Sequence, residues 1–452
     1  MGREASDSKT ARKEDLMLQE TIKKKVLKAV EAKREEAIDF WRQIVSIEST
    51  VGREAPVQEI VEKKYRSMGL EVDVFEADLE KLRKHPEYTA VEYSEKHGYK
   101  GRPNVAGKWK GSGGGKSVIL TGHIDVVPAG DRKLWKHDPL KGEIEGGRIY
   151  GRGVACNKGG ITIDAMAVAC LQGAGVKLKG DVTLVSSIED EVGSAGGQLA
   201  MVLRGYKADG GLYPHPNIGG LSGVLLASAG MLFFKVKTGG VMDEFPENGV
   251  NAIGNMFKVY QGLSELHEKR GRRIRYKGIE RFFAAGGWPP ASIRSTNIIP
   301  AIISGGEDLI QVPGHCELAC SISYPPGEDR ASVKAEVEDC IKRVAGADFW
   351  MKDNPPTVEW YAAMSPSEVA PDFPLVQILK SKVKEFKGID PEDRGIPMFC
   401  DFRFLTNYAG TPQIMIGPKA GLLHGFDEWV DLEEFFDTIK IVALTIAEWC
   451  GV

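Results

Sequence analysis

Apolar residues recur at every third or fourth position near the start of the chain, as at Ile22, Val26 and Val30, and this spacing predicts helices with one buried side. Farther on, short apolar runs alternate with helical patterns and predict buried strands. The predicted helices cover 20–45, 57–68 and 159–171, and the predicted strands cover 117–121 and 181–187. This alternation indicates an α/β fold with a mostly parallel sheet, whose ligand crevice lies beyond the carboxyl ends of the strands.

The pattern changes between about residues 230 and 360. There a strand that alternates apolar and polar residues is followed by a helix, two strands and a further helix, an order typical of a compact two-layer α+β domain. The predicted strands cover 231–237, 297–304 and 316–324, and the predicted helices cover 249–266 and 329–344. Strand–helix alternation then resumes and ends in an amphipathic helix. We therefore expect a discontinuous α/β domain, 1–229 and 363–452, that carries an inserted domain, 230–362.

The composition is that of an ordinary globular protein. The 59 Lys and Arg residues nearly balance the 63 Asp and Glu residues of the 452-residue chain, so its charge gives no reason to expect nucleic acid or an anionic membrane as a partner. No stretch approaches the roughly 20 consecutive apolar residues of a membrane span. Seven scattered cysteines without a C-x-x-C pair indicate free thiols. We expect a cytoplasmic protein whose residues 1–20 form a mobile, charged arm.

Four segments carry residue types that bind metal ions. His123 and Asp125 stand two positions apart at the end of a predicted strand, so they share one face and the carboxylate can orient the imidazole. Cys156 lies in a glycine-dense turn directly before a predicted helix. The acids of residues 189–191 follow a predicted strand, and three adjacent carboxylates repel one another unless a cation or a proton offsets their charge. Near the C-terminus, His424 follows a Gly-Pro pair.

Together these segments resemble the zinc-dependent aminoacylase and carboxypeptidase family, which includes acetylornithine deacetylase, succinyl-diaminopimelate desuccinylase and carboxypeptidase G. The resemblance covers nearly the whole chain from about residue 35 and rests on the order, spacing and flanking residues of the motifs. It implies a catalytic domain with a metal site in 1–229 and 363–452, and a lid domain in 230–362 that commonly forms dimers. We accordingly expect a homodimer or a higher homo-oligomer.

The resemblance also assigns roles to individual residues. His123 matches the first metal ligand of the family, Asp125 matches the acid that orients it, and His424 matches the last ligand. Glu191 matches the second acid of a Glu-Glu pair, which implies a further metal ligand. Asp190 takes the place of the general-base Glu of that pair. Because its side chain is one methylene shorter, we expect its carboxylate to lie back from the metal-bound water that it activates.

Three positions depart from the family pattern. Cys156 replaces an aspartate that bridges two metal ions, and His215 stands where a metal-binding Glu is expected. Cys156 is therefore either a ligand or an inert buried thiol, and His215 is either a ligand or a turn residue between two prolines. At the third position, Met242 or Asp243 replaces a lid histidine that binds the oxyanion formed from a substrate carbonyl.

The two replacements in the metal site lower its negative charge, so a second dication would be poorly compensated. We therefore expect one divalent transition metal ion per subunit. Imidazole and thiolate donors favour Zn, and imidazole with carboxylate also accommodates Mn, Fe or Co.

The missing lid histidine bears on the reaction. Amide hydrolysis needs a donor for the charge that develops on the carbonyl oxygen, whereas an electron-poor aromatic ring delocalises the incoming charge itself. We therefore expect an aminohydrolase that acts on an activated aromatic amine such as 5-nitroanthranilate. A substrate carboxylate would bind the metal or an arginine, and the candidates are Arg294, Arg394 and Arg403. The alternatives are an N-acyl-amino-acid deacylase or dipeptidase, and a non-catalytic relative that binds a ligand.

Overall fold

The computed structural model describes residues 20–452, so the predicted N-terminal arm lies outside the described residues except for Glu20, which is helical. The chain divides into two units. The first comprises Met1–Val224, Val369–Glu392 and Phe404–Val452, and the second comprises Leu225–Glu368 and Asp393–Arg403. Within the described range, no helix combines the length and the apolar character that crossing a membrane requires.

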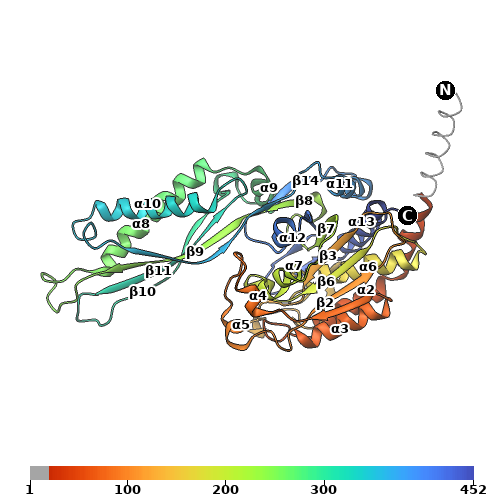
Figure 1. Cartoon of the computed structure of the whole chain (residues 1–452), viewed down its shortest axis with the longest axis horizontal. Helices are drawn as coiled ribbons and strands as arrows, with labels where there is room; N and C mark the ends of the chain where they lie inside the picture. The colour runs from red at the N-terminus through yellow and green to blue at the C-terminus, as the bar shows by residue number, and fades with distance from the viewer. Residues whose placement is uncertain (1–19) are drawn as a thin grey trace, which may run out of the picture. The chain divides into compact units, whose positions relative to one another are not determined.

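The first unit is built on a mixed, mainly parallel sheet (Figure 1). Its strands are β1 (Glu71–Phe75), β2 (Asn104–Trp109), β3 (Val118–His123), β6 (Val182–Ser187), β7 (Gly210–Pro214), β15 (Gln413–Ile416) and the beginning of β8 (Gly223–Ser228). They follow the order β1-β2-β6-β3-β7-β15-β8. β2 runs antiparallel to β1 and to β6, whereas β6, β3, β7 and β15 run parallel to one another. The carboxyl ends of these parallel strands therefore meet at one edge of the sheet.

Helix α6 (Lys158–Gly173) lies at the centre of the first unit. Its sequence is apolar on nearly every side, and every residue from Lys158 to Leu171 is buried. The helix contacts β3 and also the helices α2 (Arg34–Val45) and α13 (Leu432–Cys450), which meet through a stacked pair, Trp41 and Phe435. Residues 20–32 are also helical, and further helices are α3 (Ala55–Ser67), α4 (Leu79–Leu82), α5 (Glu92–His97), α7 (Ala200–Leu203), α11 (Pro374–Lys387) and α12 (Arg403–Tyr408).

A small antiparallel sheet joins distant parts of the first unit. Its strands are β4 (Glu143–Glu145), β5 (Arg148–Tyr150), β16 (Ala420–Gly421) and β17 (Trp429–Asp431), in the order β16-β17-β5-β4. β5 pairs with β17, and the N–H of Gly151 donates to the carbonyl oxygen of Glu428 at 3.0 Å. This pairing brings the turn that contains Cys156 beside the loop that contains His424.

The second unit has two layers: an antiparallel sheet, and two helices that lie side by side along one face of it (Figure 1). The strands are β9 (Gly230–Gly239), β10 (Ile298–Gly305), β11 (His315–Tyr324) and β12 (Thr357–Met364), in the order β10-β11-β9-β12. The helices are α8 (Ala252–Arg273) and α10 (Arg330–Gly346), with α9 (Lys277–Ala285) beyond α8. Alternate residues of β9, such as Leu232 and Phe234, join Val259 and Leu263 of α8 in the core. Two short strands, β13 (Ser367–Glu368) and β14 (Glu392–Ile396), pair with β8.

The predicted fold class is confirmed, and the structure adds detail that the hydrophobic pattern does not carry. Helix α8 continues past its predicted end at residue 266, because the polar segment that follows has partners of its own. In that segment Arg270 is buried and its Nη2 lies 2.7 Å from Glu328. Strand β12 is not predicted, because much of its surface remains exposed and its apolar period is weak.

Candidate metal centre

The residues that the sequence singles out gather where the parallel strands of the first unit end. His123 is the last residue of β3, and His215 directly follows β7. Asp190 and Glu191 begin a short 3₁₀ helix that follows β6. Loops that follow parallel strands converge at the same edge of a sheet, which is where ligand sites of α/β proteins lie.

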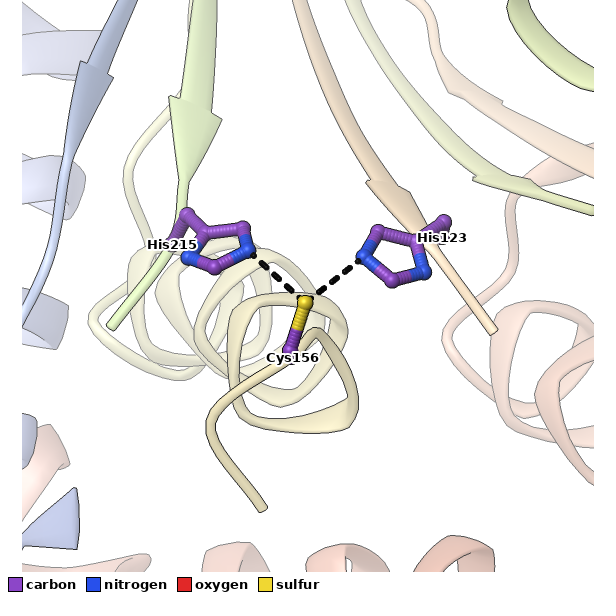
Figure 2. A group of neighbouring side chains, drawn as sticks. All are labelled: His123, Cys156 and His215. Carbon is purple, nitrogen blue, oxygen red and sulfur yellow. Dashed lines mark hydrogen bonds between the residues drawn. The ribbon is translucent and has the colours of Figure 1, made fainter. Parts of the chain in front are cut away.

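Two imidazoles and one thiol form a buried group (Figure 2). The Sγ atom of Cys156 lies 3.4 Å from Nε2 of His123 and 3.4 Å from Nε2 of His215. Figure 2 shows the two rings facing the sulfur from the ends of two strands. All three donor atoms lie within 4.8 Å of one another, so a single ion between them could contact all three.

Backbone carbonyl groups fix both rings. Nδ1 of His123 lies 3.0 Å from the carbonyl oxygen of Asp125, and Nδ1 of His215 lies 2.7 Å from that of Pro216. A neutral ring that donates from Nδ1 carries no proton on Nε2. In its neutral form each ring therefore keeps a lone pair on Nε2, directed at the sulfur side, which is the arrangement that metal-binding histidines use.

Asp125 connects the ring of His123 with the acidic segment. The sequence predicts that its carboxylate orients this ring, and Oδ1 lies 3.4 Å from Nδ1 of His123. The carboxylate also accepts the backbone N–H groups of Asp190 and Glu191, each at 3.1 Å. Asp125 thus also holds the backbone of Asp190 and Glu191 in place.

Cys156 also belongs to a second group of possible ligands, with Glu191 and His424. Oε2 of Glu191 lies 3.1 Å from Nε2 of His424, whose side chain is 48% exposed. The other oxygen of Glu191 is buried without a hydrogen-bond partner among the described residues. Oδ2 of Asp190 lies 3.4 Å from Nε2 of His123. The structure therefore brings together the five candidate ligands and the candidate general base, Asp190.

Two residues to which the sequence assigns no role hold the turn of Cys156. The Glu428 carboxylate accepts the N–H groups of Ala155 and Cys156 at 2.8 and 3.1 Å, and Nη1 of Arg152 donates to it at 2.7 Å. Arg152 also donates from Nη2 to the carbonyl oxygen of His424 at 3.1 Å. This buried ion pair joins the turn to the His424 loop. The one signal in the sequence is that each residue stands four positions from a candidate ligand.

Burial and neighbouring charges shift the pKa values in this group. Burial, with the charge of His123, lowers the pKa of His215 to about 3, so this ring stays neutral. Burial, with the charge of Glu191, raises the pKa of the Cys156 thiol well above its usual range. Burial opposes protonation of His123, but Asp190 and Cys156 outweigh it and raise the pKa of that ring. The protons on Cys156 and His123 are ones that a divalent cation would displace, because ligands bind metals in their deprotonated form.

The donor set fits a divalent transition metal ion. Imidazole nitrogen, thiolate sulfur and carboxylate oxygen are the three donor types that zinc sites use. The buried oxygen of Glu191 without a hydrogen bond is explained by a cation, since a buried polar atom is otherwise paired. The three buried donors match in number the protein ligands of catalytic zinc sites.

The three candidate arginines all belong to the second unit. Nη1 of Arg294 donates to the carbonyl oxygen of Ala291 at 2.8 Å, and its Nη2 lies 3.6 Å from Glu268. Arg394 and Arg403 are buried, and Nη1 of Arg403 donates to the carbonyl oxygen of Cys400 at 3.2 Å. Their role toward a substrate stays a prediction.

The fold and the donor set are those of a metallohydrolase. A family model described as peptidase family M20/M25/M40 matches residues 119–448, and the chain belongs to this family. The chain is 29% identical over 378 residues to an N-formyl-4-amino-5-aminomethyl-2-methylpyrimidine deformylase of Bacillus subtilis (strain 168), which covers 78% of this chain and 84% of that protein. It is 28% identical over 335 residues to a succinyl-diaminopimelate desuccinylase of Stenotrophomonas maltophilia (strain R551-3), with coverages of 72% and 82%.

Solved structures show the same fold. The di-peptidase Dug1p of Saccharomyces cerevisiae superimposes with a TM-score of 0.71 at 14% identity, over 95% of this chain and 98% of that chain. A dinuclear metal-binding M20 peptidase of Bacillus subtilis, the YXEP protein, superimposes with a TM-score of 0.62 at 12% identity, over 93% and 100%. The predicted family and the prediction of an enzyme are thus confirmed: the chain is an M20 metallohydrolase that acts on C–N bonds. The family binds divalent metal ions.

Proposed function

We propose that this chain hydrolyses the C–N bond of a small substrate with one divalent transition metal ion, Zn, Mn or Co. The observation that carries the proposal is the buried group of His123, Cys156 and His215, whose three donor atoms could contact a single ion. Glu191 and His424 complete the proposed set of ligands.

Asp190 is the proposed general base. A divalent cation, when bound, lowers the pKa of a water molecule and polarises the group under attack. Asp190 removes a proton from this water and later returns one to the leaving nitrogen. Its side chain is shorter than that of Glu, yet its Oδ2 lies 3.4 Å from a proposed ligand atom, Nε2 of His123. Asp125 supports this position, because it accepts the backbone N–H of Asp190.

Charge favours one ion over two. Both groups of possible ligands contain Cys156, so two ions would have to share its sulfur. The proposed ligands carry at most two negative charges, from the thiolate of Cys156 and the carboxylate of Glu191. Two dications would leave two positive charges uncompensated by ligands in a largely buried site, whereas one dication is balanced.

The proposed reaction is removal of the amino group of an activated aromatic amine, such as 5-nitroanthranilate, as in 5-nitroanthranilate aminohydrolase. Water adds to the ring carbon that bears nitrogen, the electron-poor ring takes up the charge, and the C–N bond breaks as nitrogen leaves as ammonia. Three departures from the family pattern support this reaction: Cys156, His215, and the absence of the lid histidine. Neither Met242 nor the ionised form of Asp243 can donate a hydrogen bond to a carbonyl oxyanion.

The proposed substrate carries a carboxylate, and an arginine is its proposed partner. Arg294, Arg394 and Arg403 are the candidates that would bind it, since a guanidinium pairs with a carboxylate through two parallel hydrogen bonds. Arg394 and Arg403 are largely shielded from water, which strengthens such a pair.

A second candidate function is deacylation of an amide, as in an N-acyl-amino-acid deacylase or a dipeptidase. The similarity to a deformylase and a desuccinylase supports it, because both of those proteins remove an acyl group from nitrogen. Deacylation requires another donor in place of the lid histidine.

Product analysis separates the two functions. Protein loaded with Zn, Mn or Co is incubated with 5-nitroanthranilate, with N-acetyl amino acids and with the N-formyl pyrimidine of the deformylase relative. Ammonia from the first compound supports the aminohydrolase. If the N-acetyl amino acids release acetate or the N-formyl pyrimidine releases formate, and 5-nitroanthranilate releases no ammonia, the protein is a deacylase and not an aminohydrolase.

We further propose a homodimer or higher homo-oligomer formed through the β10 edge of the second unit. β10 is the outermost strand of its sheet, and Ile299, Ile302 and Ile303 along it are more than half exposed. An exposed apolar edge strand pairs readily with a second copy of itself. A cytoplasmic location is also proposed, and the seven free cysteines support it.

A further inference from the structure

The three adjacent acids of residues 189–191 point in two directions. Glu189 has a φ of 70°, in the left-handed region, and the N–H of Ser194 donates to its carbonyl oxygen at 2.7 Å. The Glu189 side chain is fully buried, and its hydrogen bonds go to residues that are not candidate ligands. Asp190 and Glu191 instead contact His123 and His424. One member of the acidic cluster is therefore separated from the metal site.

Four donors hold the Glu189 carboxylate. Oε2 accepts the hydroxyl of Tyr99 and the N–H of Gly196, both at 2.7 Å. Oε1 accepts the hydroxyl of Ser94 and, at 3.3 Å, Nη1 of Arg102. Hydrogen bonds to a charged acceptor are stronger than neutral ones, and a buried carboxylate with four of them is held in one position.

Arg102 ties this carboxylate to a second buried acid. Its Nη2 and Nε atoms donate to the two oxygens of Glu54 at 2.6 and 3.1 Å, a bidentate pair. The side chain of Arg102 is 4% exposed and that of Glu54 is fully buried. Glu54 is the residue before α3, so the network anchors the acidic segment to a helix of the core.

The backbone around Glu189 is held as well. The side-chain oxygen of Asn104, the first residue of β2, accepts the N–H of Ile188 at 3.1 Å. Its side-chain nitrogen donates to the carbonyl oxygen of Gly196 at 2.8 Å. Residues 188–196 are thus fixed at both ends, and Glu189 holds the segment directly before Asp190 and Glu191.

We propose that Glu189 and Arg102 are positioning residues that hold Asp190 and Glu191 at the metal site. The carboxylates of Asp190 and Glu191 repel each other, so both remain directed at the metal site only when their backbone is fixed. Removing outer partners of metal ligands typically costs about 10–100-fold in metal affinity or activity. The inference rests on the proposed function, since it concerns the same site.

The experiment compares Arg102→Lys with a matched control, Arg270→Lys. Arg270 is also a buried arginine between two glutamates, Glu328 and Glu336, but it belongs to the second unit. Each change keeps the charge and removes the planar fork that pairs with two carboxylates. Three quantities are measured: the Tm of the metal-free protein, the Co²⁺ affinity by competition with a chromophoric chelator, and kcat and KM on the active substrate.

We expect R102K to weaken Co²⁺ binding about 10–100-fold and to lower kcat by a similar factor with little change in KM. R270K should lower Tm comparably and leave Co²⁺ affinity unchanged. At saturating Co²⁺ the thiolate-to-metal absorption should persist in R102K, because Cys156 lies outside the anchored segment. Should R102K fail to fold, Glu189→Gln is measured in its place with the same expectation. Its side-chain NH₂ group would face the hydrogen-bond donors that hold the Glu189 carboxylate.

Unchanged Co²⁺ affinity in R102K overturns the proposal, and so does an equal loss in R270K, which would indicate a general effect of destabilisation. The Co²⁺ measurements need no substrate. A wild-type protein that binds Co²⁺ yet hydrolyses nothing would overturn the proposed function and leave this test intact.

Discussion

The Sγ atom of Cys156 lies 3.4 Å from Nε2 of His215, so the two residues that replace carboxylates in the family pattern face each other directly. The replacement is therefore paired: sulfur and nitrogen stand where two oxygen donors would be expected. Soft and borderline donors select Zn or Co over the oxygen-seeking Mg²⁺ and Ca²⁺. This contact makes the role of Cys156 the first question for experiment.

Cys156→Ser should weaken Zn²⁺ or Co²⁺ binding by more than about 10-fold. The change removes a thiolate ligand itself, and the loss in affinity should exceed that caused by removing an outer partner of a ligand. The thiolate-to-Co²⁺ absorption should disappear with it. Both are measured by optical titration. Cys170→Ser is the matched control, since Cys170 is a second buried cysteine of the same unit, within α6. A Cys156→Ser protein that binds as tightly as the wild type would make Cys156 an inert buried thiol.

Asp190→Asn should lower kcat by about 100-fold or more, the usual contribution of a general base, while Zn²⁺ content stays that of the wild type. The amide keeps the shape of the side chain and cannot accept the proton of water. Steady-state kinetics and metal analysis of the purified proteins give the two readings. Asp190→Glu, which restores the residue of the family pattern, should retain far more activity than Asp190→Asn. Equal activity of wild type and Asp190→Asn would assign the base to another group.

The sequence predicts the fold and the convergence of the ligands better than their supports. His123 and the acids after β6 stand at the ends of apolar runs, and the ends of parallel strands must meet, so their proximity follows from local pattern and sheet geometry. The role of Glu428 does not follow in this way. It depends on the pairing of β5 with β17, strands far apart in the chain whose short segments carry no distinctive period.

The separation of Glu189 from its two neighbours is hidden for a similar reason. In the sequence three acids look equivalent, and what distinguishes them is one backbone angle and a distant arginine, Arg102. From the sequence, the three adjacent acids need a cation or a proton to offset their charge. The structure supplies a cation as a protein side chain for Glu189, while Asp190 and Glu191 face the candidate metal ligands.

His137 should make the stability of the fold depend on pH. Its Nε2 lies 2.8 Å from Glu145 and its Nδ1 lies 3.3 Å from Asp427, and the ring stacks on Tyr150. Burial opposes protonation of His137, but the two carboxylates outweigh it and raise its pKa. Because the folded state then binds the proton more tightly, this stabilisation is complete below the unfolded pKa of about 6.5 and is lost as the pH rises through the folded value.

The measurement compares the free energy of unfolding of wild type and His137→Gln in urea across that range of pH. The difference between them should be largest at the acidic end and should shrink as the pH rises. In a Glu145→Gln background, which lacks one of the carboxylates, the dependence should be weaker. A difference that stays constant with pH would show that His137 contributes through packing on Tyr150 alone.

Ile302→Lys should dissociate the proposed oligomer of the β10 edge. The side chain of Ile302 is 68% exposed on an outermost strand, and after the strand Leu309 and Ile310 are exposed still further. A lysine on each copy would place like charges together at a shared edge, which is how natural edge strands avoid pairing. Light scattering coupled to size exclusion gives the molar mass directly. Leu134→Lys, at an exposed apolar position of the first unit, is the control and should keep the wild-type mass. If the wild type is already a monomer, or if Ile302→Lys leaves its mass unchanged, the β10 edge is not the interface.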